Sequence, residues 1–350
     1  MRARDVLLGG LALALAAIGV GLTPRPSQLD ERAATAVVET PVDTWIEAEI
    51  ARAQQAGVRP GNEPRLVRHT PGKSAVAFLY LHGFGASRAE GEAVMDPLAE
   101  ELGANLLYGL LPGHGTDDPD YHALPGPREY LQMTAQALHE ARQLGDHLVV
   151  VGSSTGGLLA TWLAAEHPDQ VEALILASPF FEFRDPMARL LDTRLGPILV
   201  PMVQGPDRYA GWTVNPEGRV QQPGYDAHWT THQRTSALFG LADLRRHIAT
   251  PETFARVRAP ALILAYEADE EHQDTVVSVD AMRAALGLFG GAAGPDPASR
   301  LVKIADGNHI LTSAYVRTDK DTINKEIRSF LGEVLPAPPE ALEPPDGATP

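Results

Sequence analysis

The stretch "VVVGSSTGGLLA", residues 149–160, decides the expected fold, because a glycine-rich turn joins an apolar strand pattern to a helix pattern there. Residues 152–156 read GSSTG and fit the pattern G-x-S-x-G, with Ser154 at the centre. In such a turn, glycines let the strand and helix backbones approach closely, and the central serine is held in a strained conformation with its Oγ exposed. The stretch therefore predicts that Ser154 is a nucleophile and that Ser153 is structural.

Short apolar runs recur on both sides of this turn and alternate with helix-like segments such as 128–144 and 158–167. Runs this short and this apolar are typical of parallel strands buried on both faces. Alternating strands and helices predict an α/β fold with a mostly parallel, doubly wound sheet flanked by helices. The predicted strands are Ser74–His82, Ala104–Pro112, His147–Ser153, Val171–Ser178, Pro260–Tyr266 and Arg300–Asp306.

The segment from Phe180 to Ala259 interrupts this alternation, because about 80 residues are far too many for a plain crossover between strands. It is rich in aromatic residues, prolines and glycines. We interpret residues 180–259 as a cap inserted between the last strand before the catalytic acid and the strand that carries it. The whole globular domain is expected to span residues 41–335, beginning with an amphipathic helix that ends at Gly57.

A serine hydroxyl is a weak nucleophile without a base, and ligands of such sheets bind beyond the carboxyl ends of the strands. His309 follows the last predicted strand and is the expected base. Two acids follow the preceding strand, in "ALILAYEADEEHQDTVVS". Asp274 is favoured because an apolar pair follows it and can pack under the loop, while Asp269 lies closer to the strand and remains the alternative. Either choice gives the chain order Ser, Asp, His.

An oxyanion formed on attack by Ser154 needs backbone N–H donors. One is expected from Thr155, the residue after the nucleophile. The second is expected from Phe84, because "LHGFGAS" follows the first strand of the predicted sheet and its glycines allow the loop to double back. His114, in "LLPGHGTDD", is interpreted as structural. No metal site is predicted, since His228 and His232 have no carboxylate at a helical spacing.

Together, "LHGFGAS", "LLPGHGTDD", "VGSSTGGLLATWLAAEHPDQVEALILASPF", "DTVVS" and "GNHILTS" resemble the α/β-hydrolase superfamily. Within it they are most similar to serine hydrolases of the monoacylglycerol lipase and carboxylesterase type, over about residues 65–335. The resemblance implies a triad of Ser154, His309 and an aspartate, with Phe84 and Thr155 as oxyanion donors and no cofactor. The sequence departs from that pattern in "EADEEHQD", which is longer than the usual turn before the acid.

The expected activity is therefore hydrolysis of a carboxylic ester through an acyl-enzyme, by an esterase or a lipase of the monoacylglycerol or lysolipid type. The aromatic and leucine-rich cap favours a small, lipid-like substrate with an apolar acyl chain. The alternatives are a thioesterase or an acyltransferase of the same fold, and a non-catalytic binding protein that has kept it. Epoxide or haloalkane hydrolysis is disfavoured, because the residue at the centre of the turn would then be an aspartate.

The N-terminal segment "MRARDVLLGGLALALAAIGVGL", residues 1–22, has two arginines ahead of the uncharged apolar run Val6–Leu22. This is the layout of a secretory signal peptide or of a short signal anchor, and both readings stay open. Either predicts export. The domain would be anchored on the outer side of the cytoplasmic membrane, or secreted or periplasmic if the segment is cleaved. Residues 23–40 are expected to form a linker.

Composition excludes several other classes of function. The formal net charge of −16 argues against nucleic acid as a partner. The chain has no cysteine, which excludes disulfides, thiolate catalysis and zinc–thiolate sites. The proline-rich, acidic residues 336–350 are expected to be disordered.

Overall fold

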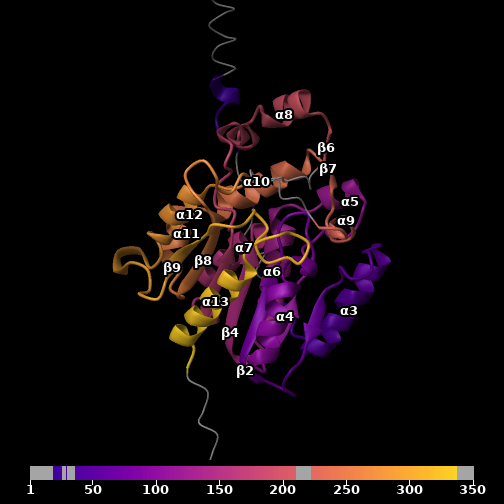
Figure 1. The fold of residues 1–350 in the computed structure, drawn as a ribbon. Coiled ribbons are helices and arrows are strands. Elements are labelled where there is room, and N and C mark those ends of the chain that lie inside the picture. Colours follow the sequence, from indigo (N-terminus) through magenta and orange to yellow (C-terminus); the bar gives the residue numbers. More distant parts are fainter. Residues whose placement is uncertain (1–18, 26–28, 30–35, 210–221, 337–350) are drawn as a thin grey trace, which may run out of the picture.

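The computed structural model describes residues 19–25, 29, 36–209 and 222–336, and a seven-stranded sheet lies at its centre (Figure 1). The strand order is β1-β3-β2-β4-β5-β8-β9, in which β1 is antiparallel to β3 and the other neighbours are parallel. This is the α/β-hydrolase fold that the sequence predicts. The strands are β1 (Arg65–Val67), β2 (Ser74–Leu81), β3 (Asn105–Tyr108), β4 (Gly145–Ser153), β5 (Ala173–Ala177), β8 (Ala261–Tyr266) and β9 (Arg300–Ile304).

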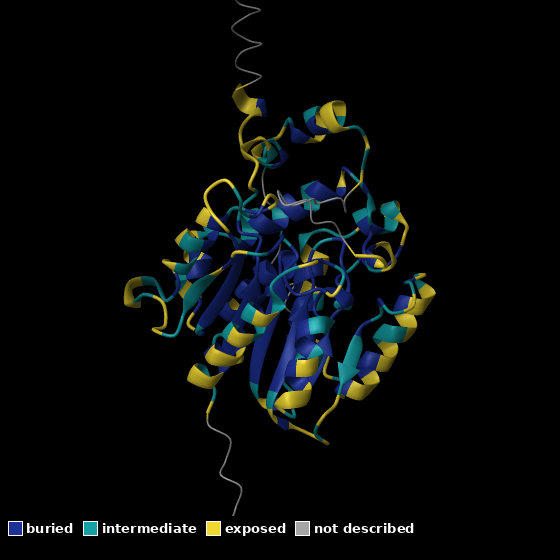
Figure 2. Cartoon of the chain, in the orientation of Figure 1, coloured by how far each residue is buried: buried dark blue, intermediate teal, exposed yellow. Residues whose placement is uncertain are grey.

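Helices cover both faces of the sheet, so the central strands are buried on both sides (Figure 2). In β2, Leu79 packs into one core and Tyr80 into the other, which is why these strands are continuous apolar runs. One face is covered by α4 (Glu92–Glu101) and α13 (Lys320–Val334). The other is covered by α3 (Val42–Gln55), α6 (Pro127–Ala141), α7 (Thr155–Glu166), α10 (Ala237–Ile248), α11 (Pro251–Arg256) and α12 (Val279–Leu286).

All six predicted strands are present, and their bounds differ mainly in length. The second is much shorter than its apolar run, because β3 ends at Tyr108 and the chain turns into the loop that carries His114. The sequence analysis missed the edge strand β1, which is only three residues long and half-buried. The predicted helices over 41–57, 128–144 and 158–167 correspond to α3, α6 and α7.

The first part of segment 178–260, between β5 and β8, lies beyond the carboxyl ends of the strands (Figure 1). This part contains η2 (Pro186–Asp192), α8 (Gly196–Gln204), α9 (Tyr225–His228) and the antiparallel pair β6 (Asp207–Tyr209) and β7 (His232–Arg234). The last part of the segment, α10 and α11, packs against the same core as α7 and belongs to the helical layer of the sheet. The remaining short elements are η1 (Arg88–Glu90), α5 (Pro119–Ala123) and η3 (Gly291–Ala293).

The described residues of the N-terminal segment lie on the cap. Pro24 forms a β-bridge with Thr193, and the Leu195 N–H donates to the carbonyl of Gly21. The predicted signal or anchor segment otherwise lies outside the described residues, as does the predicted tail beyond residue 336. Within the described part of the chain, no helix is both long enough and apolar enough to cross a membrane.

Candidate active site

The turn between β4 and α7 has the strained geometry that its sequence predicts. Ser154 has a φ of 50° and a ψ of −112°, a combination that few residues other than glycine adopt. The turn is held by three backbone hydrogen bonds. The Ser154 N–H donates to the Ala177 carbonyl at 2.9 Å, and its carbonyl accepts from Leu158 at 3.1 Å and from Phe180 at 3.0 Å. These bonds offset the strain and keep Oγ above the sheet.

The two flanking glycines are required by close backbone contacts. A Cβ at position 152 would lie 2.3 Å from the Gly156 carbonyl oxygen, and a Cβ at position 156 would lie 1.9 Å from the Leu81 carbonyl oxygen. Both distances are far shorter than any real non-bonded carbon–oxygen contact. A larger residue at 152 would have to move α7 away from β4, and one at 156 would have to move it away from β2.

Ser154, His309 and Asp274 form a continuous hydrogen-bonded chain. His309 Nε2 lies 3.0 Å from Ser154 Oγ, and His309 Nδ1 lies 2.8 Å from Asp274 Oδ2. Because a carboxylate can only accept, Nδ1 carries the hydrogen and Nε2 accepts from the serine hydroxyl. The other carboxylate oxygen of Asp274 accepts from the N–H groups of Val276 and Val277, at 2.8 and 3.0 Å. Asp274 is fully buried, so its orientation is determined by these bonds.

The long loop before Asp274 closes on itself. Glu267 and Gln273 form a β-bridge, and the Asp274 N–H donates to the Tyr266 carbonyl at 3.0 Å, so the chain returns to the end of β8 before the acid. Asp269 lies at the tip of this excursion, where its Oδ1 accepts from the N–H groups of Glu271 and His272. Its side chain is 58% exposed and pairs with His272, not with His309. Of the two candidate acids, the structure brings only Asp274 to the histidine.

The two expected oxyanion donors line the same cavity as Ser154. Thr155 is the first residue of α7, where backbone N–H groups have no partner inside the helix. Within the described part of the chain, neither the Phe84 N–H nor the Thr155 N–H donates to another protein group. Both amides are therefore free to bind a ligand oxygen beside Ser154.

Glu90 is a site residue that the sequence analysis missed. Its carboxylate is buried, accepts from the Gly83 N–H at 2.6 Å and lines the cavity with Ser154. A Cβ on Gly83 would contact both Glu90 Oε1, at 3.0 Å, and Ser154 Cβ, at 3.2 Å, so this carboxylate lies next to the nucleophile. The sequence signal that could have indicated Glu90 is an acidic residue shortly after the glycine-rich loop that follows the first predicted strand.

The charges of Asp274 and Glu90 influence the pKa of His309. Burial by itself would lower the pKa of His309, but the charge of Asp274, its hydrogen bond and the charge of Glu90 together raise that pKa above the ordinary value for histidine. Burial raises the pKa of Glu90, against the opposing effects of the Gly83 N–H and of His309. The site therefore favours the imidazolium form of His309 once a proton reaches it.

Three neutral histidines support the loop that carries Phe84. The Phe84 ring packs edge-on against His114 and His122, with ring centroids 5.6 and 4.5 Å away. His114 Nδ1 lies 2.8 Å from the Pro112 carbonyl, and burial lowers its pKa to about 4. Burial likewise lowers the pKa of His82 to about 3. His114 thus fixes its loop, as the sequence predicts, and these rings pack beneath Phe84 uncharged at neutral pH.

A cavity of about 540 Å³ extends from Ser154 and His309 to the cap. Its walls are mostly apolar and come from the loop after β5, from η2, α8 and α10. The charged residues in its lining are Glu90, beside Ser154, and Asp185 and Arg208, in the cap. A cavity of this size and character suits a small molecule with an apolar part.

The fold and this arrangement define the class of an α/β-hydrolase. The sequence pattern of the family described as serine aminopeptidase, S33, matches residues 72–285, more than half of the chain. The chain therefore belongs to that family.

Two curated relatives match over shorter stretches. The dihydrolipoyllysine-residue acetyltransferase component of the acetoin cleaving system of Cupriavidus necator is 33% identical over 155 residues, which are 44% of this chain and 38% of that protein. The pimeloyl-[acyl-carrier protein] methyl ester esterase of Salmonella heidelberg is 34% identical over 120 residues, which are 33% of this chain and 42% of that protein. The chain thus spans less than half the length of the relatives it matches.

Solved structures resemble the chain over most of its length. A structure from work on the metagenome-derived lipolytic enzymes LipS and LipT has a TM-score of 0.62 at 20% identity and covers 79% of this chain and 99% of its own. The monoacylglycerol lipase of Paleococcus ferrophilus has a TM-score of 0.55 at 16% identity, covering 77% and 98%. At these identities the likeness establishes the fold, and the activity has to be argued from the site.

The close contact at Gly156 leads to a testable prediction. Gly156→Ala should lower the free energy of unfolding by roughly 3 kcal/mol or more, because the new methyl group overlaps the Leu81 carbonyl. In the matched control Gly332→Ala, a methyl group added in α13 meets nothing within 4 Å, and stability should rise by about 0.5–1 kcal/mol. Urea unfolding of both variants measures the difference. Equal stabilities would contradict the close packing of α7 on β2.

Proposed function

We propose that the protein is a serine hydrolase of carboxylic esters with Ser154, His309 and Asp274 as its catalytic triad. The observation that carries the proposal is that His309 lies within hydrogen-bonding distance of both Ser154 Oγ and Asp274 Oδ2 at the base of an apolar cavity. A nucleophile, a base and an orienting acid in this order of contacts are the parts that acyl transfer by serine requires.

Each residue has a defined step. Ser154 Oγ attacks the ester carbonyl while His309 Nε2 takes its proton, and Asp274 stabilises the imidazolium that results. The same nitrogen then donates the proton to the leaving alcohol, which leaves an acyl group on Ser154. A water molecule deprotonated by His309 Nε2 attacks this acyl-enzyme. When the second tetrahedral intermediate collapses, the same nitrogen donates that proton to Ser154 Oγ, and the carboxylic acid is released.

In each tetrahedral intermediate the former carbonyl oxygen carries a negative charge. The N–H groups of Phe84 and Thr155 are proposed as its donors, since both residues line the cavity beside Ser154. Glu90 contributes in two ways: its carboxylate holds the Gly83 N–H, next to Phe84, and its charge favours protonated His309. We regard Glu90 as a positioning residue of the site.

The cavity favours an ester with an apolar acyl chain. Phe180, Leu191 and Leu238 are among its lining residues, and all three are buried. Relatives described as a methyl ester esterase, a lipolytic enzyme and a monoacylglycerol lipase fit a small or lipid-like ester substrate of this kind. We also propose that residues 1–22 direct the chain out of the cytoplasm, as their charged start and apolar run suggest.

The proposal predicts covalent labelling at one serine. A fluorophosphonate probe should label the wild-type protein and the variant Ser153→Ala, but not Ser154→Ala, because only Ser154 Oγ contacts the base. Hydrolysis of a short p-nitrophenyl ester should fall about 10⁶-fold in Ser154→Ala. Gel fluorescence and absorbance measure the two effects. A folded wild-type protein that remains unlabelled would rule out the proposed function.

The two candidate acids are separated by matched substitutions. Asp274→Asn should lower kcat by about four orders of magnitude, because the asparagine amide would leave the imidazole in the wrong tautomer. Asp269→Asn, in the same loop but on the exposed tip, should change kcat roughly twofold at most. Steady-state kinetics on one ester decide between them, and the reverse pattern would assign the role to Asp269.

The charge of Glu90 leads to a prediction about how activity depends on pH. The base must be neutral to accept the serine proton, so activity is lost as pH falls through the pKa of His309, which Asp274 and Glu90 raise. Glu90→Gln keeps an acceptor for Gly83 but removes the charge, so the acidic limb of the kcat/KM profile should move to lower pH. Glu101→Gln, at the distant end of α4, is the control and should leave the limb in place. If the acidic limb is unchanged in Glu90→Gln, the charge of Glu90 does not affect the pKa of His309.

A further inference from the structure

Nearly half of the large apolar side chains exposed in the described residues lie at one end of the molecule. Of the thirteen large apolar side chains exposed in the described part of the chain, six lie in residues 19–25 or in the cap between 187 and 203. We call the surface they form the cap apex: Val20, Leu22, Met187, Ile198, Met202 and Val203. Figure 2 shows the exposed ribbons of α8 and of the first described residues together at this end. Exposed apolar surface that is clustered in this way marks an interaction site.

The N-terminal residues are built into this surface. Besides the bridge between Pro24 and Thr193, the Arg194 N–H donates to the Thr23 carbonyl at 3.1 Å, and Gly21 lies directly against the Leu195 side chain. Val20 and Leu22 are thereby held next to the start of α8. The apolar run that begins at Val6 thus meets the folded domain at the cap apex.

Arg25 holds the N-terminal residues on the cap through polar contacts of its side chain and backbone, which we call the Arg25 lock. Its side chain is 17% exposed and donates to the carboxylate of Asp243 and the carbonyl of Leu191, both at 2.9 Å. In return its own carbonyl accepts from Arg246 Nη1 at 2.7 Å. These partners lie on α10 and at the end of η2, so residue 25 joins the cap to the helical layer of the sheet.

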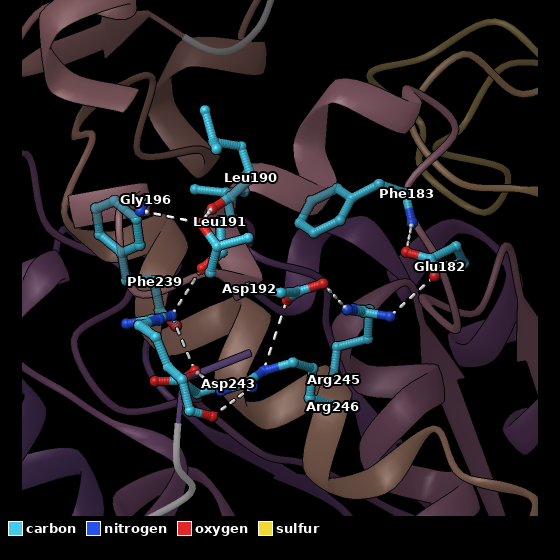
Figure 3. A network of polar contacts seen from close by, with 12 residues as sticks. Glu182, Phe183, Leu190, Leu191, Asp192, Gly196, Phe239, Asp243, Arg245 and Arg246 are labelled. Atoms are coloured by element: carbon cyan, nitrogen blue, oxygen red, sulfur yellow. Dashed lines mark hydrogen bonds and ion pairs between the residues drawn. The ribbon is translucent and has the colours of Figure 1, made fainter. Parts of the chain in front are cut away.

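A series of polar contacts leads from the Arg25 lock towards the active site. Asp192, whose backbone carbonyl accepts from the Arg25 N–H, pairs through its carboxylate with Arg245, and Arg245 also pairs with Glu182 (Figure 3). The Glu182 carbonyl accepts from the Ser278 N–H at 3.0 Å, in the segment that follows Asp274. The N-terminal contact is therefore connected through polar contacts to the segment that follows Asp274.

The cavity opens at the same surface. Met187 and Val203 belong both to the cap apex and to the lining of the cavity that contains Ser154. Between residues 184 and 204 the exposed charges are Arg184, Arg189 and Arg194 against Asp185, although the chain as a whole carries −16. An apolar surface bordered by arginines matches the surface of a bilayer that contains anionic lipid.

We infer that the cap apex docks on a phospholipid bilayer and that the Arg25 lock holds residues 19–25 against the cap, so that the mouth of the Ser154 cavity faces the same bilayer. Docking itself is independent of the proposed function. The idea that docking lets a lipid ester enter the cavity from the membrane does rest on the proposed function. Retention of residues 19–25 also follows, since cleavage near Ala36 would remove the lock.

A cysteine-free chain makes this inference directly testable. In the full chain, Met202→Cys and, as the control, Leu102→Cys are each labelled with an environment-sensitive fluorophore. Leu102 is also exposed but follows α4 at the amino ends of the strands. With vesicles of phosphatidylcholine and phosphatidylglycerol that carry a lipid-borne quencher, the label at 202 should be quenched and that at 102 should not. Equal quenching at both positions, or none at either, would overturn the inference.

The lock is tested by adding Arg25→Ala to Met202→Cys, with thermal unfolding monitored by circular dichroism to confirm that the domain is folded. The protein should still sediment with vesicles through its apolar segment, but quenching at 202 should be lost. Retained quenching would show that the lock is not needed. A spectral shift at 202 that grows with protein concentration in the absence of vesicles would instead identify a second copy of the chain as the occupant and overturn the lipid assignment.

The same samples separate this inference from the proposed function. If a short, soluble ester is hydrolysed while the label at 202 is not quenched, docking fails and the hydrolase proposal stands. If the label is quenched while Ser154 does not react with the fluorophosphonate, the hydrolase proposal fails and docking stands.

Discussion

The close approach of α7 to β2 is the constraint on which the rest of the site depends. Gly156 lies so near the Leu81 carbonyl that no side chain fits, and this proximity forces the chain through a positive φ at Ser154. The strain is local, and three backbone hydrogen bonds offset it, one to the end of β5, one from the loop after β5 and one from α7. As a result Ser154 Oγ, the start of α7 and the Phe84 loop all meet above the same strand ends.

Electrostatics organise the residues around that serine. Asp274 is buried, aligned by two backbone N–H groups and bonded to His309, so its charge acts on the imidazole in a medium that screens little. Glu90 adds a second buried carboxylate on the other side of the nucleophile. The Phe84 ring packs against His114, whose pKa burial lowers, so this ring is uncharged at neutral pH.

The cap links this site to the N-terminal segment. A backbone hydrogen bond from Arg25 to Asp192 is followed by ion pairs of Arg245 with Asp192 and Glu182. These contacts connect the first described residues of the chain with the segment that follows Asp274. Partly buried pairs of this kind contribute specificity of arrangement more than net stability. The cap therefore presents a fixed apolar surface next to the opening of the cavity.

The sequence by itself determined the sheet, its helices, the strained turn and the candidates Ser154, His309, Phe84 and Thr155, because periodic burial and glycine spacing are local properties. It left Asp274 and Asp269 unresolved and missed Glu90. Residues 23–25 were predicted to lie in a linker, although Pro24 forms a β-bridge with Thr193 of the cap. Only the tertiary structure decided these points, through a loop that closes on itself before Asp274, a buried carboxylate that accepts from Gly83 and an arginine that joins the cap to the helical layer. The distances in these contacts depend on how the elements pack and not on their spacing in sequence.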